Sequence, residues 1–251
     1  MAQHRFFVPP DLLLQSPITL EGALAHQLSR VLRLKPGDQI ELLDGQGEAY
    51  LVALEQVTPR RCLAIEINRY RPDTEPATRF VLYQAISKGQ KLDWVWQKAT
   101  ELGVSELVPM ATARTIGAEL RQVGATRLER LQRIAQEAAE QSGRARIPQV
   151  RPAITFEEAL SEREPGNLAL IGALTPEALS LQKALEDQST SPGTVRLYVG
   201  PEGGLDDNEV SQARNREVQP ISLGPRTLRT ETAGIALLAI LAYALGDMET
   251  R

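Results

Sequence analysis

The stretch Leu197-Tyr-Val-Gly-Pro-Glu-Gly-Gly204 decides the fold class of this chain. It begins as a short apolar run typical of a buried strand and then breaks into a loop rich in glycine. A second stretch, Ser222-Leu-Gly-Pro-Arg-Thr-Leu-Arg-Thr-Glu-Thr-Ala-Gly234, repeats the order of strand, Gly/Pro loop and helix. Ligands bind at the carboxyl ends of strands in open parallel sheets, so the two loops predict two walls of one binding site.

The sequence around these loops predicts an α/β domain over residues 72–251, because apolar runs alternate with helical patterns. The predicted strands cover 80–86, 106–109, 168–171, 195–199 and 218–223. The predicted helices cover 92–102, 126–141 with Gly143 closing it, 176–186, 206–216 with Asp206 or Asp207 as its N-cap, and 230–245.

Residues 1–71 predict a separate β-rich module, a small barrel or sandwich with one helix. Its strands are expected at 6–8, 39–43, 50–57 and 62–67, and its helix at 21–34, where apolar residues recur at helical spacing. The Pro-containing polar segment 71–76 is typical of a linker. The chain is therefore expected to have two domains.

Composition limits the classes of function. The 251 residues include one cysteine and two histidines, which excludes an internal disulfide and a Cys/His metal cluster. The longest charge-free apolar run, 233–245, is too short to span a bilayer, and residues 1–7 lack the apolar core of a signal peptide. We therefore expect a cytoplasmic protein with no membrane partner and no metal.

The net charge of −4 argues at first sight against a nucleic-acid partner. The acidity is concentrated from residue 151 onward, where the sequence has 15 acidic and 9 basic residues. Residues 1–150 hold 19 basic and 17 acidic side chains, which leaves room for a basic surface there.

The first loop alone fits a simple strand-to-helix turn as well as a ligand site. The second loop favours a ligand, because the charged residues Arg226, Arg229 and Glu231 lead into an almost wholly apolar helix. Thr230 as an N-cap and Glu231 as a first-turn acid would account for two of its polar residues. The common phosphate-loop, dinucleotide and nucleophile-elbow motifs are absent from the sequence.

These segments closely resemble the signature segments of the RsmE family, bacterial methyltransferases of the SPOUT superfamily that modify N3 of a uridine in small-subunit (16S) ribosomal RNA. The blocks 26–33, 84–91, 98–104 and 137–144 are similar to further family blocks in the same order. One departure is Ala113-Arg114-Thr115, where the family usually has Glu-Arg-Ser.

The resemblance implies a C-terminal SPOUT-type α/β domain with a deep trefoil knot and an N-terminal PUA-like β-barrel that binds RNA. It implies a homodimer, with the last helix at or near the interface, although that helix could equally be buried in its own subunit. It implies that S-adenosylmethionine binds in the knot. The residues expected to contact it are Gly200, Pro201, Glu202, Gly203, Leu223, Gly224, Leu228, Arg229 and Thr230.

For catalysis the resemblance points to Arg114, Arg229 and Glu231. Uridine N3 carries a proton at neutral pH, so Glu231 is a candidate base, while either arginine could stabilise negative charge on the uracil oxygens. The expected RNA contacts are Arg5, Arg30, Arg33 and Arg114, with ribosomal RNA or an assembled 30S subunit as partner. From the sequence alone, Arg30 and Arg33 could equally lie on a solvated helix face. Lys88 and Lys91 either meet phosphate or are solvated, and Trp94 and Trp96 are expected in the core.

Two other functions stay open. A different SPOUT activity, such as methylation of a ribose 2′-oxygen, would share the Gly200–Gly204 loop. A non-catalytic RNA-binding or assembly factor would keep the fold but would show a broken cofactor loop, and both loops are intact in this sequence.

Overall fold

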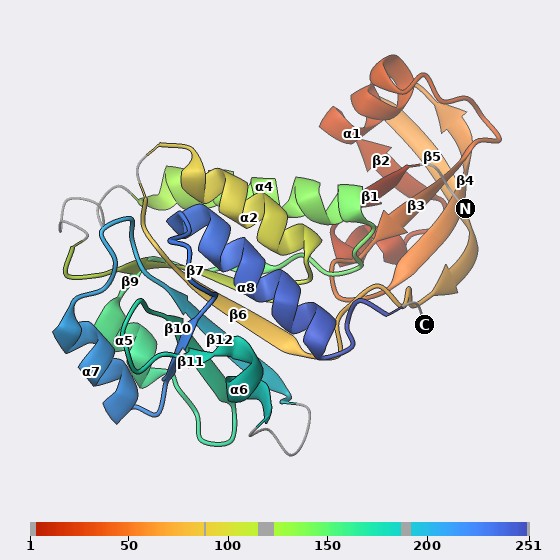
Figure 1. Cartoon of the computed structure of the whole chain (residues 1–251). Coiled ribbons are helices and arrows are strands. Elements are labelled where there is room, and N and C mark those ends of the chain that lie inside the picture. The colour runs from red at the N-terminus through yellow and green to blue at the C-terminus, as the bar shows by residue number, and fades with distance from the viewer. Residues whose placement is uncertain (1–3, 88, 115–122, 187–191, 250–251) are drawn as a thin grey trace. The chain divides into compact units, whose positions relative to one another are not determined.

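The computed structural model describes residues 4–87, 89–114, 123–186 and 192–249, and the chain forms two compact units (Figure 1). The first unit contains residues 1–75 and 139–147, and the second contains 76–138 and 148–251. This division differs from the predicted 1–71 and 72–251 in two respects. The break falls after Glu75, and a short segment from the middle of the sequence belongs to the first unit.

The first unit is built on a five-stranded sheet in the order β1-β3-β4-β5-β2. Its strands are β1 (Arg5–Phe7), β2 (Ile18–Glu21), β3 (Gln39–Leu43), β4 (Ala49–Val57) and β5 (Arg61–Tyr70). All neighbours are antiparallel except β1 and β3. Two register shifts between β4 and β5 bend these long strands, as bulges do. The short strand β2 was not predicted.

The single predicted helix of this unit is present but shorter than expected. Helix α1 (Gly22–His26) continues as a π-helical turn, η2 (Gln27–Val31), and a 3₁₀ turn, η1 (Pro10–Leu14), precedes it in the chain. The helix ends at Leu32, and Arg33 has a φ of +56°. This left-handed conformation usually belongs to glycine at a helix C-terminus, so it is strained for arginine.

The segment 139–147 is held in the first unit by a set of polar contacts. The Glu75 carboxylate accepts hydrogen bonds from the main-chain N–H groups of Ala145 (3.0 Å) and Arg146 (3.1 Å). Arg5 Nη1 donates to the carbonyl of Gly143 at 2.9 Å. Gly143 has the expected helix-ending conformation, and a Cβ there would lie 2.4 Å from Arg5 Nη1. With a φ of +77°, glycine is strongly favoured at this position.

The second unit is built on an eight-stranded sheet whose pairs are all parallel, which confirms the predicted α/β class. The order is β11-β13-β10-β12-β6-β7-β8, and β9 also pairs with β7. The strands are β6 (Arg79–Ala85), β7 (Glu106–Ala111), β8 (Gln149–Val150), β9 (Ile154–Thr155), β10 (Leu168–Gly172), β11 (Leu179–Ser180), β12 (Thr194–Val199) and β13 (Gln219–Ser222).

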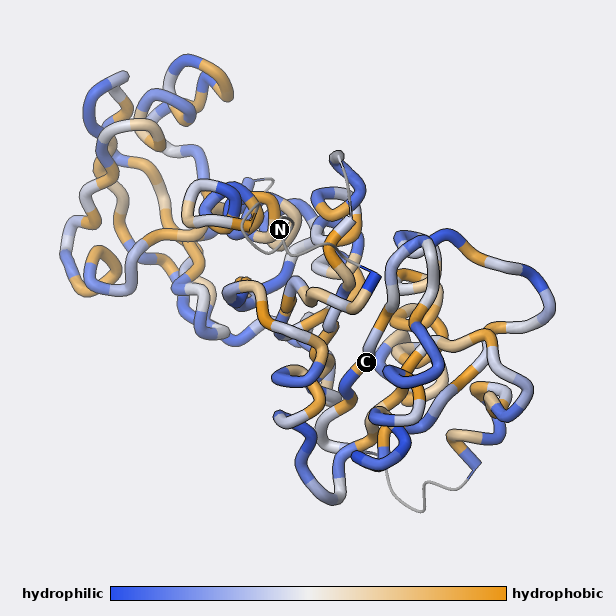
Figure 2. The backbone as a smooth tube through the Cα atoms, turned by 90° about the vertical axis from the view of Figure 1, so that its left-hand side faces the viewer, coloured by the Kyte–Doolittle hydropathy of each residue, from blue (hydrophilic) through white to orange (hydrophobic). Residues whose placement is uncertain are grey.

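Helices cover both faces of this sheet (Figure 1). One face packs on α2 (Lys91–Glu101), α4 (Ala125–Ser142), α6 (Leu181–Glu186) and α8 (Thr230–Ala244), and the other on α5 (Phe156–Ser161) and α7 (Asp207–Asn215). Alternate residues of a strand therefore enter different cores: Phe80 and Leu82 face one layer, Val81 and Tyr83 the other. Figure 2 shows the hydrophobic colour concentrated on the inner elements and the hydrophilic colour on outer loops.

Some details differ from the predictions. The helix expected at 176–186 begins only at Leu181, because the two-residue strand β11 precedes it. Trp96 is fully buried as expected, but Trp94 is wrongly predicted, since it is 44% exposed. The trefoil knot, a statement about how the chain threads, stays a prediction.

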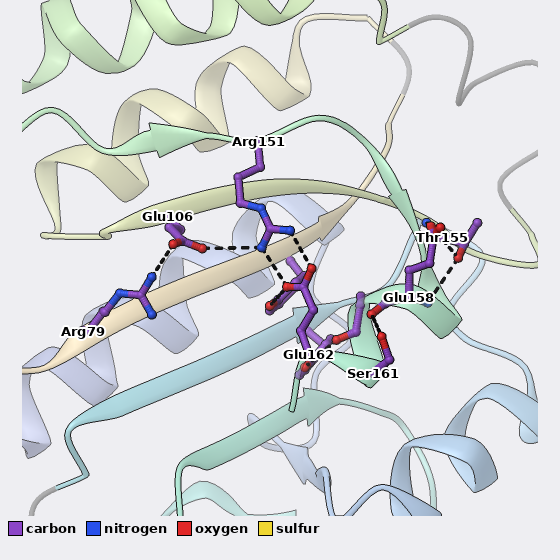
Figure 3. Close-up of polar contacts among 10 residues, drawn as sticks. Arg79, Glu106, Arg151, Thr155, Glu158, Ser161 and Glu162 are labelled. Carbon is purple, nitrogen blue, oxygen red and sulfur yellow. Dashed lines mark hydrogen bonds and ion pairs between the residues drawn. The ribbon is translucent and has the colours of Figure 1, made fainter. Parts of the chain in front are cut away.

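A polar cluster lies on the second face of the sheet (Figure 3). Glu162 accepts hydrogen bonds from both ends of the Arg151 guanidinium, at 2.5 and 2.7 Å, and from the Tyr83 hydroxyl at 2.6 Å. Hydrogen bonding to Arg151 is the largest cause that holds the pKa of Glu162 below its usual range, and Tyr83 adds to it against the opposing effect of burial. The Tyr83 ring stacks on Tyr198 at 4.6 Å, so the cluster joins two central strands to α5.

Replacement Glu162→Gln should lower the free energy of unfolding at pH 7 by roughly 1–3 kcal/mol, the range for hydrogen bonds to charged groups. Because the pKa of Glu162 is lower in the folded protein than in the unfolded chain, its stabilisation is complete above about pH 5 and is lost as pH falls through the folded pKa. Urea unfolding of both proteins between pH 7 and pH 3 should show the difference shrinking with acid. The exposed neighbour Glu157→Gln is the control, and a difference independent of pH would contradict the assignment.

Candidate functional site

Three loops meet at the carboxyl edge of the parallel sheet. In the strand register Gly172 at the end of β10 lies opposite both Val199 of β12 and Ile221 of β13. Because the three neighbouring strands end at the same level, the loops that follow them are brought side by side. Two of these loops are the predicted ones, and the third, Gly172-Ala-Leu-Thr175, carries no charge or glycine-rich pattern that would have marked it.

These loops enclose a cavity of about 510 Å³. All nine residues predicted to contact a cofactor line it, and so do Arg114 and Arg226. The volume lies within the range of small-molecule sites in proteins. The structure thus brings the predicted residues together in one place, while the identity of what they bind stays a prediction at this point.

The unpredicted third loop supplies an apolar side chain and a hydroxyl. Leu174 is 73% exposed although it is aliphatic, and it lines the cavity. Thr175 also lines the cavity, and its Oγ1 has no hydrogen-bond partner within the part of the chain that the structure describes. An exposed leucine beside an unpaired hydroxyl suits a ligand with both a flat apolar part and a polar group.

The two predicted loops are joined through Thr230. Its hydroxyl donates to the carbonyl of Gly200 at 2.5 Å and accepts from Gln84 Nε2 at 2.8 Å. Thr230 is the first residue of α8, and the N-cap is Arg229, which has no capping side-chain hydrogen bond. The reading of Thr230 as an N-cap is therefore wrong, because its hydroxyl joins two loops instead.

The side chain of Gln84 explains why residue 234 is a glycine. This side chain is fully buried at the end of β6, and a Cβ at Gly234 would lie 2.7 Å from its Oε1. Glycine at 234 lets α8 approach β6 closely enough for the Gln84–Thr230 hydrogen bond. Sequence reasoning missed Gln84, since it lies 146 residues from its partner.

The charged side chains divide between the cavity and its rim. Arg114 is exposed, lines the cavity and donates to the carbonyl of Gly203. Lys91 Nζ lies 2.6 Å from Glu202 Oε1 and 3.8 Å from Glu231 Oε2. Hydrogen bonding to Glu202 raises the pKa of Lys91. Glu202 lines the cavity but Glu231 does not, and within the described residues the buried Glu231 Oε2 has no hydrogen-bond partner.

The other predicted residues lie elsewhere. Arg5, Arg30 and Arg33 belong to the first unit, and Arg30 and Arg33 are exposed there. Arg5 is engaged within its unit, since its Nε lies 2.6 Å from the buried Glu41 carboxylate. Lys88 and Thr115 lie outside the described residues.

Two family models match the chain: an RNA methyltransferase domain over residues 74–242 and an RNA methyltransferase PUA domain over residues 20–67. A ribosomal RNA small subunit methyltransferase E from Synechocystis is 35% identical over 94% of this chain and 76% of its own length. The chain belongs to the RNA methyltransferase E family. The family resemblance stated from the sequence is thereby confirmed.

Solved structures of family relatives have the same fold. A ribosomal RNA small subunit methyltransferase E from Neisseria gonorrhoeae bound to S-adenosyl methionine has a TM-score of 0.86 and 34% identity, covering 98% of this chain and 99% of its own. A methyltransferase from Legionella pneumophila in complex with the bound cofactor SAM has a TM-score of 0.84 and 30% identity, covering 97% and 98%. These likenesses extend over both units of the chain.

The described residues contain neither a membrane-spanning helix nor a metal-binding cluster. No helix there is both long and apolar enough to cross a bilayer. Within the same residues, no group of three or more His, Cys, Asp or Glu side chains is placed to hold a metal ion.

Replacement Thr230→Val should lower the free energy of unfolding by roughly 2 kcal/mol, because it leaves the buried Gln84 amide without an acceptor and the Gly200 carbonyl without a donor. Thr230→Ser keeps the hydroxyl and should lose under about 1 kcal/mol. Urea unfolding followed by circular dichroism measures both. A loss in Thr230→Val no larger than the loss in Thr230→Ser would contradict the role given to the hydroxyl.

Proposed function

We propose that this chain methylates N3 of a uridine in small-subunit (16S) ribosomal RNA, with S-adenosylmethionine as the methyl donor. The observation that carries the proposal is the cavity between three loops at the carboxyl ends of β10, β12 and β13. Family membership supports it, as do two relatives at 30% and 34% identity whose structures hold this cofactor. A cytoplasmic location is part of the proposal, since bacterial ribosomes are assembled there.

The residues present fit S-adenosylmethionine. The cavity is large enough for a nucleoside with an amino-acid tail, and five of its lining residues are glycines, which let a ligand approach the main chain. Thr175 also lines the cavity, and its buried hydroxyl oxygen has no hydrogen-bond partner in the described part of the chain. Gly200–Gly203 and Leu223–Thr230 would form two walls, and Gly172–Thr175 the third. When bound there, the cofactor supplies a methyl group activated by a positively charged sulfur.

The protein's own part in the reaction is to orient the uracil and to stabilise its anion. Uridine N3 must lose a proton, and negative charge then spreads onto the flanking carbonyl oxygens. Arg114 and Arg229 line the cavity, which supports giving them the stabilisation of that charge. Glu231 does not line the cavity, which favours this electrostatic role over Glu231 as the base. The N3 proton then passes to water.

RNA binding is proposed for the first unit through Arg30 and Arg33. Both side chains are exposed, and both lie at the end of a helix with a π-helical turn. Arg33 holds a left-handed conformation that glycine would adopt at lower energy, which supports a role for its side chain outside folding. Arg5, which is already paired with Glu41, is the weaker candidate.

Homodimer formation through α8 is also part of the proposal. This helix is apolar on all sides: Leu237, Leu238 and Leu241 are buried, but Ile240 and Tyr243 are 46% and 74% exposed. Trp94 adds an exposed aromatic ring on α2, which packs against α8. An apolar patch of this kind favours contact with a second subunit.

Purified protein should bind S-adenosylmethionine at about one site per chain in a calorimetric titration. Gly203→Val should weaken binding at least tenfold, since its side chain would extend toward Arg114 beside the cavity, where the Cβ alone already lies 3.4 Å from Arg114 Cδ. Gly193→Val is the matched control, because its Cβ meets nothing within 4 Å. Failure of the wild type to bind, with small ribosomal subunits also present, would contradict the proposal.

The product identifies the reaction. Small subunits incubated with enzyme and donor, then digested to nucleosides for mass spectrometry, should contain 3-methyluridine, with the Gly203→Val enzyme at least tenfold slower. A 2′-O-methylated nucleoside would instead indicate the ribose-methylating alternative. No methylation by a protein that binds the donor would indicate an assembly factor.

Replacement Arg33→Gly should raise the free energy of unfolding by about 1 kcal/mol and lower kcat/KM for small subunits at least fivefold, with donor affinity unchanged. The stability gain comes from relief of the left-handed strain, and the activity loss from the missing cation. Glu217→Gly is the matched control, because Glu217 has the same φ of +56° after α7. It should keep full activity, and its stability gain should be smaller because the variant also loses the ion pair with Arg163. Full activity in Arg33→Gly would remove Arg33 from the RNA interface.

A further inference from the structure

Glu209 is a buried carboxylate close to the proposed active site, and the sequence predicts no role for it. It lies in the first turn of α7 and is only 5% exposed. One carboxylate oxygen accepts from the main-chain N–H of Asp206 at 2.9 Å. The other accepts from the main-chain N–H of Ala113 at 2.8 Å, from a residue 96 positions away in sequence.

The first of these bonds belongs to ordinary helix capping. Asp206 is the N-cap of α7, as one of the two predicted alternatives had it, and Asp206 and Glu209 form a capping box. Helix α5 has the same device, and there both bonds of Glu158 return to Thr155, from its main-chain N–H (2.7 Å) and its hydroxyl (2.9 Å) (Figure 3). The bond from Ala113 to Glu209 is therefore additional to what capping requires.

The additional bond fixes the residue before Arg114. Ala113 is the last residue before this arginine, whose guanidinium donates to the carbonyl of Gly203. A Cβ at Gly203 would lie 3.4 Å from Arg114 Cδ, so the arginine stem runs along the glycine loop. Glu209 thus ties the main chain on both sides of the contact: Ala113 before Arg114, and Asp206 after the glycine loop.

We propose that Glu209 is a positioning residue that holds Arg114 over the cavity, a role that rests on the proposed methyl transfer. Its carboxylate is suited to this because it has two acceptor oxygens and no donor, so it can bind two main-chain N–H groups at once. An amide in its place keeps one acceptor and presents an NH₂ group to the second N–H. The hydrogen bond from Ala113, the residue before Arg114, is then lost, while α7 and the Gly200–Gly204 loop stay in place.

The test combines Glu209→Gln with Arg114→Ala in a double-mutant cycle. Glu209→Gln should lower kcat for methylation of small subunits at least tenfold, with the donor Kd changed less than threefold, as expected for misplacement of a group that acts on the reacting atoms. In the Arg114→Ala background the same change should have little further effect on kcat. Additive effects, or an unchanged kcat, would overturn the proposal.

A second variant and a control separate positioning from folding. Ala113→Pro removes the N–H donor but leaves the capping box of α7 intact, and it should lower kcat as Glu209→Gln does. Glu158→Gln loses only the local bonds of the other capping box and should keep its kcat. If Ala113→Pro retains full kcat, the bond to Glu209 does not position Arg114.

Hydrogen exchange of the 110–114 peptide gives a readout that does not need activity. Exchange should be faster in Glu209→Gln and unchanged in Glu158→Gln, and equal rates in wild type and Glu209→Gln would overturn the proposal. A wild type that transfers no methyl group would instead overturn the proposed function, and with it the role of Arg114. An active wild type with an equally active Glu209→Gln variant would overturn the positioning role alone.

Discussion

The hydroxyl of Thr230 is the interaction on which the geometry of the candidate site depends. It receives a hydrogen bond from the buried Gln84 and gives one to the carbonyl of Gly200, so a single side chain connects the ends of β6 and β12 with the start of α8. Gly234 belongs to the same arrangement, because any larger residue would push α8 away from Gln84. The loops around the cavity are thus held in place by the buried side chains of Gln84 and Thr230.

The sheet supplies the second constraint. Parallel strands that end in register place their following loops at one edge, and β12 lies between β6 and β10 although it comes much later in the sequence. This insertion brings Arg114, which follows β7, close enough to bind the loop after β12. The chemistry attributed to the cavity therefore depends on residues from four strands, each contributing a short loop.

Much of this could be predicted from the sequence, for identifiable reasons. Glycine and proline mark the loops after β12 and β13 because few other residues permit such turns, and apolar runs mark the buried strands. The Gly172–Thr175 wall could not be predicted, because its residues have no unusual composition. Gln84 and Glu209 were missed because their partners lie 146 and 96 residues away, and β8 and β9 because two residues show no periodicity.

The segment 139–147 has a consequence for how the molecule is made. The first unit is completed only by residues that follow most of α4, with Glu75 binding Ala145 and Arg146. During synthesis the N-terminal strands must therefore wait until about 150 residues have been translated before their unit can close. A gene fragment that ends at Glu75 therefore lacks part of the first unit, and one cut in the chain does not separate the two units.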